Sequence, residues 1–78
     1  KVMIFPNPVE TEMIIESSHF IQNLTVINLM GEVLHYHENI GFSNQISTVD
    51  WRNGLYFILI DFTNNKSITE VIVKTNSY

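Results

Sequence analysis

The apolar residues of this chain fall in short blocks, and polar or turn-forming residues interrupt these blocks about every ten positions. Strands separated by tight turns produce this pattern, whereas an amphipathic helix would repeat its apolar residues with a period of about 3.6. No segment of helical length keeps that period. With 78 residues the chain has room for a single hydrophobic core. We therefore expect one small all-β domain.

Two segments indicate how individual strands are used. Met13 and Ile15 share one face of segment 12–16, and Glu12, Ile14 and Glu16 share the other, which is typical of a half-buried strand. Residues 55–60 are apolar on both faces. This predicts a central strand with one face on the core and the other covered by a loop or a partner.

The strand count sets the expected architecture. The candidate strands are residues 2–5, 12–16, 24–29, 32–37, 45–49, 54–61 and 67–74. Residues 38–44 are expected to form a loop between two of them. The pattern predicts a small seven-stranded antiparallel β-sandwich of immunoglobulin-like architecture over residues 1–74, with residues 75–78 as a short C-terminal tail.

Prolines and glycines mark where the chain must turn. Pro6 and Pro8 fix φ and lack an N–H, and Asn7 is restricted because it precedes a proline. The three residues therefore predict a stiff edge segment or a strand exit. Gly31 and Gly54 follow turn-like sequences, where glycine supplies the positive φ that other residues avoid.

Composition excludes several classes of function. The chain has no cysteine, so neither a disulfide framework nor a thiolate site is available. Four basic residues against eight acidic ones, without a basic cluster, argue against a nucleic-acid partner. No stretch approaches the roughly 20 apolar residues of a membrane helix. Since the chain starts in a strand without a methionine, we expect it to be cut from a larger precursor.

Side chains that could carry chemistry do not form a recognisable set. No nucleophile elbow, phosphate loop or paired acidic motif is present, so we expect no enzyme, no cofactor and no small-molecule substrate. His35 and His37 lie two apart and share a strand face, but zinc requires three or four ligands. If Leu34 and Tyr36 face the core, both histidines face solvent. The sequence therefore favours no metal site.

Aromatic residues leave a second function open. Trp51, Tyr56, Phe57 and Phe62 could form a platform that recognises sugars or proteins. Packing in the core is the simpler explanation in a small sandwich. The platform would make the chain an adhesive or carbohydrate-binding module of a secreted protein, and a structural spacer without a ligand is a third alternative.

The order of several landmarks resembles a known family. The landmarks are Phe5-Pro6-Asn7-Pro8, then Leu24-Thr25-Val26-Ile27-Asn28 with Met30-Gly31-Glu32-Val33-Leu34, then Trp51-Arg52-Asn53-Gly54-Leu55-Tyr56-Phe57, and finally Val71-Ile72-Val73-Lys74. Over almost the whole chain they resemble the C-terminal sorting domain, type A, of cargo exported by the type IX secretion system. Leucine is usual in that family where Trp51 stands, and the last strand usually finishes nearer the chain end.

The resemblance implies a role as an address on an exported protein of Bacteroidota. It implies a compact β-sandwich that follows an N-terminal cargo domain and passes through the periplasm to the cell surface or outside. The implied partners are the outer-membrane type IX translocon, a β-barrel shuttle protein and a sortase that removes the domain.

Family-motif positions carried over by the resemblance are Pro6, Asn7, Pro8, Gly31, Gly54, Tyr56, Val73 and Lys74. Proline and glycine at such positions chiefly shape turns. Among these residues we expect Lys74 to be the better recognition candidate, because a charge at the end of a strand is not needed for packing. A free sheet edge could also pair with a strand of a partner.

Overall fold

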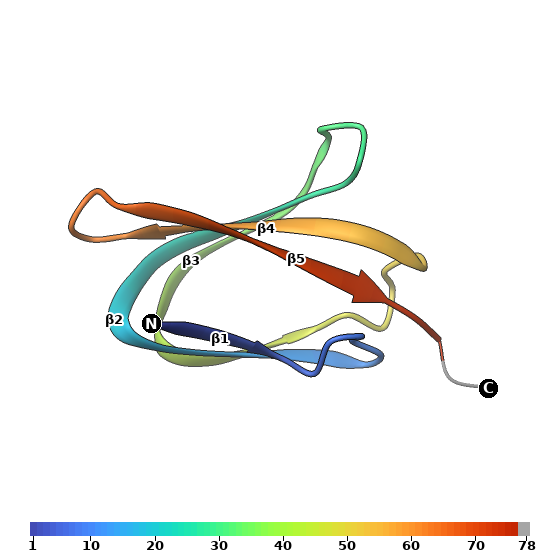
Figure 1. The fold of residues 1–78 in the computed structure, drawn as a ribbon, viewed down its shortest axis with the longest axis horizontal. Coiled ribbons are helices and arrows are strands. Elements are labelled where there is room, and N and C mark those ends of the chain that lie inside the picture. Colours follow the sequence, from blue (N-terminus) through green and yellow to red (C-terminus); the bar gives the residue numbers. More distant parts are fainter. Residues whose placement is uncertain (77–78) are drawn as a thin grey trace.

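The computed structural model describes residues 1–76 as an all-β domain (Figure 1). Every strand pair is antiparallel, and the sheet order is β1-β2-β4-β5 with β3 also paired to β2. The strands are β1 (Val2–Phe5), β2 (Glu12–Ile27), β3 (Val33–Ser47), β4 (Gly54–Phe62) and β5 (Ser67–Lys74).

Long, bent strands give the sheet its shape. The first half of β2 pairs with β1, from Phe5 opposite Ile14 to Val2 opposite Ser17. The second half of β2 pairs with β4 instead, and β3 follows β2 through both halves. Figure 1 shows the result, with β4 and β5 in one layer and β1 with the start of β2 in the other. One open sheet therefore curls over itself.

The predicted seven-stranded, immunoglobulin-like sandwich is wrong, although the all-β class is confirmed. Residues 17–23, which lie between two of the expected strands, continue β2, and residues 38–44, expected to form a loop, continue β3. The pairing of β2 with β3 shifts register on either side of Ile21, and Asn39 and Gly41 within β3 have φ of 56° and 82°. Irregularities of this kind bend a strand without ending its hydrogen bonding. Four of the expected strands are thus halves of two.

The core fills the inside of the curl. Met13 and Ile15 are fully buried there, as their alternation with glutamates predicted. Every second residue of β4 also points inward, and each such side chain contributes roughly 1.5 to 3 kcal/mol by leaving water. The buried apolar residues are Val9, Met13, Ile15, Ile21, Leu24, Val26, Ile40, Ile46, Trp51, Tyr56, Ile58, Ile60 and Ile72.

The central position predicted for residues 55–60 is confirmed, since β4 lies between β2 and β5. Its inner face carries Tyr56, Ile58 and Ile60, all buried. On the outer face, Leu55 is 42% exposed, so residues 1–76 supply no loop that covers it. A partner that covers this face stays a prediction.

Candidate functional site

The eight predicted site residues gather in two places. One group is at the outer edge of β5, and the other lies at the end of the sheet where two loops approach. The groups adjoin because Gly54 pairs with Lys74 across β4 and β5. The edge group comprises Pro6, Asn7, Pro8, Val73 and Lys74, and the end group comprises Gly31, Gly54 and Tyr56.

At the edge, residues 7–9 close the sheet against β5. The Asn7 Nδ2 donates to the Val71 carbonyl at 3.3 Å, and the Val73 N–H donates to Asn7 Oδ1 at 3.0 Å. The backbone of Val9 continues this pairing, donating to the Val73 carbonyl at 2.8 Å and accepting from the Thr75 N–H at 2.9 Å. We call this contact the β5 junction. An asparagine side chain here replaces one step of a strand ladder.

The two prolines lie on either side of Asn7, where the chain leaves β1 as predicted. β1 ends at Phe5, and both the Phe5–Pro6 and Asn7–Pro8 peptide bonds are cis. Residues without an N–H suit this place, because the segment next to an edge cannot use a full ladder. The prediction of a strand exit is confirmed.

Lys74 departs from its prediction. Its side chain is 1% exposed, and Nζ donates to the Asn76 Oδ1 at 2.8 Å. The expectation that this charge is not needed for packing is therefore wrong, because the side chain is buried and its ammonium is hydrogen-bonded within the fold. Recognition of Lys74 by a partner stays a prediction. Of the predicted tail, Thr75 and Asn76 make these contacts, and residues 77–78 lie outside the described residues.

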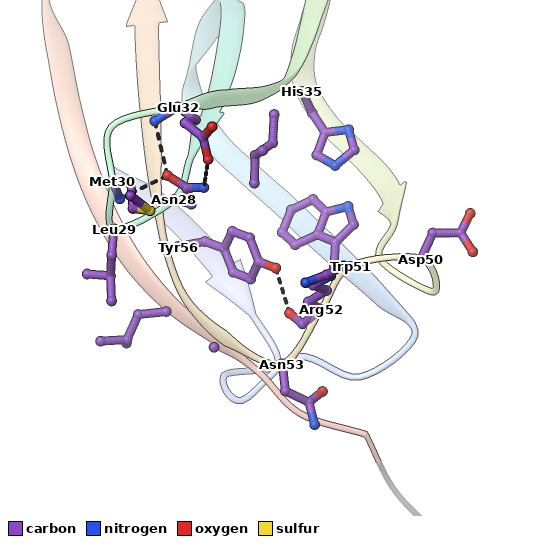
Figure 2. Close-up of a pocket in the computed structure, with 13 residues that line it drawn as sticks. Asn28, Leu29, Met30, Glu32, His35, Asp50, Trp51, Arg52, Asn53 and Tyr56 are labelled. Atoms are coloured by element: carbon purple, nitrogen blue, oxygen red, sulfur yellow. Dashed lines mark hydrogen bonds between the residues drawn. The ribbon is translucent and has the colours of Figure 1, made fainter.

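At the end of the sheet, the loop of residues 28–32 and the segment 50–56 enclose a cleft of about 560 Å³ (Figure 2). We call it the end cleft. Its apolar lining comes from Leu29, Met30, Leu34 and Leu55, with Glu32, Asp50 and Arg52 among the charged residues around them.

Asn28 organises the first wall of the end cleft. Its Oδ1 accepts from the N–H groups of Met30 at 2.9 Å and Glu32 at 3.0 Å, while its Nδ2 donates to the Glu32 carboxylate at 2.7 Å. Gly31 completes the turn with φ of 82°, as predicted. The loop thereby holds Leu29 and Met30 in water, with 66% and 84% of their surfaces exposed.

Aromatic packing forms the second wall. Trp51 is buried, stacks on His35 with ring centroids 5.1 Å apart and lies 5.0 Å from the Tyr56 ring. The Tyr56 hydroxyl donates to the Arg52 carbonyl at 2.5 Å, as Figure 2 shows. Gly54, with φ of 147°, then starts β4. Core packing is confirmed for Trp51 and Tyr56, so neither ring offers a face for a platform.

The two histidines of β3 lie on the inner side rather than in solvent. His35 and His37 share a face, as predicted, with their rings stacked 6.4 Å apart. The conditional expectation that Leu34 and Tyr36 face the core is wrong, since they are 42% and 53% exposed. Among the residues the structure describes, no three His, Asp or Glu side chains are arranged to hold a metal ion.

Comparison with known protein families identifies the family of this chain. The profile of the family described as the secretion system C-terminal sorting domain matches residues 3–74, which include the β5 junction and the end cleft. The chain belongs to this family. None of the curated proteins matches it. A sorting domain of this kind is part of a larger cargo protein that the secretion machinery carries to the cell surface or outside.

No helix in residues 1–76 of the sorting domain is long and apolar enough to cross a bilayer. The features of its surface are instead loops and sheet faces. Leu29 and Met30 are the residues that sequence reasoning missed as part of a site. Their signal was available, because two apolar residues directly before the turn glycine Gly31 have no role in the turn itself.

Proposed function

We propose that the sorting domain acts as a non-enzymatic address that the outer-membrane translocon of the type IX system recognises in its folded form. In this proposal the cargo crosses the periplasm, is handed to a β-barrel shuttle protein, and loses the domain to a sortase at the cell surface. The family match over residues 3–74 is the observation that carries the proposal.

The structure supports recognition of a folded shape rather than of a linear motif. Two of the family-motif residues use their polar side-chain atoms within the fold. Asn7 is hydrogen-bonded to the backbone of Val71 and Val73, and Tyr56 to the backbone of Arg52. Near Tyr56, the exposed Leu29 and Met30 lie on a loop that Asn28 holds by hydrogen bonds. An adhesive function gains no support, because Trp51 and Tyr56 are buried.

A fusion experiment tests the proposal. Residues 1–78 are placed behind a signal peptide and a fluorescent cargo, in a bacterium that has the type IX system. We expect the fluorescent cargo to reach the cell surface or the medium, and to remain in the periplasm of a matched strain that lacks the translocon. Periplasmic retention in the strain with the complete system would refute the sorting function.

A further inference from the structure

The outer side of β2, β4 and β5 carries a continuous apolar strip. Ile27, Phe57 and Val71 are cross-strand partners in one row, and Leu55 follows two residues before Phe57 on the same face. The loop that begins just after Ile27 adds Leu29 and Met30, which line the end cleft together with Leu34 and Leu55. We call this surface the outer apolar band.

The outer apolar band is open to water. Val71 is 48% exposed, Leu55 42%, and Leu29 and Met30 more. Within residues 1–76 no other element packs over β4 and β5 from outside. Contiguous exposed apolar surface bordered by polar residues is typical of an interaction site.

The charged residues on the strands of this face are acidic. Four residues along the strands from the Ile27–Phe57 pair, Glu38, Asn23 and Asp61 are aligned across β3, β2 and β4. The one lysine or arginine in strands β2 to β5 is Lys74, which is buried on the inner side. At the end cleft, Arg52 is accompanied by Glu32 and Asp50, so that end is also negative overall.

We infer that the outer apolar band is the surface by which the sorting domain docks onto a protein of the secretion machinery. That protein would present an apolar surface with lysine or arginine side chains placed opposite Glu38 and Asp61. Complementary charge of this kind fixes register and speeds encounter. A second copy of this chain does not fit, because the strands of its band offer no cation to these carboxylates and its Arg52 is accompanied by Glu32 and Asp50. The inference rests on the proposed sorting function.

The fusion described above tests the band with matched variants. Met30→Ser with Val71→Thr removes apolar surface from the band, whereas Met3→Ser with Val49→Thr makes the same changes at residues that are 52% and 61% exposed elsewhere. We expect export to fall about tenfold for the band variant, which corresponds to about 1.4 kcal/mol of lost binding. The control variant should be exported as the unchanged fusion is.

Three results would overturn the inference. They are normal export of the band variant, an equal loss in the control variant, and cross-linking of two fusion chains through a photoreactive residue at position 30. If the unchanged fusion itself stays in the periplasm, the sorting function fails instead, so the two failures are distinguishable. Should proteolysis show that the double variant is unfolded, Met30→Ser alone decides, because that side chain is 84% exposed at a loop tip.

Charge reversal tests the chemistry of the partner. Glu38→Lys places a cation in the acidic row, while Glu12→Lys makes the same change at an exposed glutamate in the first half of β2. We expect Glu38→Lys to lower export several-fold and Glu12→Lys to leave it unchanged. Equal export of both variants would contradict a basic partner surface.

Discussion

The β5 junction and the loop of the end cleft each depend on the side chain of an asparagine, but the two asparagines bond to partners at very different distances along the sequence. Asn7 bonds to residues 64 and 66 positions away, at Val71 and Val73. Asn28 bonds to residues two and four positions away, at Met30 and Glu32. The first asparagine closes the whole sheet, whereas the second shapes one loop.

This difference indicates which residues of the sorting domain define the fold and which define its surface. Replacing Asn7 should affect the free energy of unfolding of the entire domain. Replacing Asn28 should instead release a loop whose apolar side chains are available to a partner. Four changes test this contrast, from the largest expected effect to the smallest.

Trp51→Ala should lower the free energy of unfolding most, because it leaves a cavity between the end cleft and the core. We expect a loss of about 3 to 5 kcal/mol in the free energy of unfolding. Since Trp51 is the single tryptophan, urea unfolding of this variant is followed by circular dichroism. Val49→Ala, at a residue 61% exposed, serves as the control and should stay within about 0.5 kcal/mol of the unchanged domain. A loss below about 1 kcal/mol for Trp51→Ala would contradict the packing described.

Asn7→Ala should come next, since it removes both side-chain bonds to the edge of β5. We expect the free energy of unfolding to fall by about 1 to 3 kcal/mol. Urea unfolding followed by Trp51 fluorescence measures the change, with Asn53→Ala at an exposed asparagine as the matched control. If both variants unfold at the same urea concentration, the β5 junction does not hold the sheet closed.

Asn28→Ala should have a smaller and more local effect. We expect a loss of about 1 kcal/mol, together with faster amide hydrogen exchange at Met30 and Glu32. Exchange at Val73, which the β5 junction protects, should not change. Faster exchange throughout β5 would show that the two asparagines do not act separately.

Lys74→Met should change stability least. It keeps the buried stem and removes an ammonium that is costly to bury, so the free energy of unfolding should stay within about 1 kcal/mol of its original value. In the fluorescent fusion, we expect export of this variant to be normal, because a side chain that is 1% exposed cannot contact a partner directly. Lost export with unchanged stability would restore Lys74 as a recognition residue.

Local patterns predicted the parts of the fold that depend on neighbouring residues. The alternation around Met13 and Ile15, the central apolar strand and the turn at Gly31 are all present. The bends at residues 17–23 and 38–44 were not predictable in this way. A polar segment can be a loop or a bulged strand, and only pairing with distant strands decides between them.

The site residues also divide into those that local sequence predicts and those that depend on distant parts of the chain. Tyr56 and Gly54 lie at the end cleft, where their sequence context suggested a turn and a strand start. Lys74 is buried, and its backbone pairs with Val9, which reaches β5 from the other end of the sequence. No local pattern contains that information, because Val9 and the lysine are brought together only by the curl of the sheet.

The long reach of Asn7 has a consequence for when the domain can fold. Its partners belong to the last strand, so the sheet cannot close before the final residues of that strand have been made. A cargo chain that ends early, or that is trimmed before export, would carry an unfinished domain even if the rest of it were intact. The closed sheet therefore forms only on a cargo chain that has been synthesised through β5.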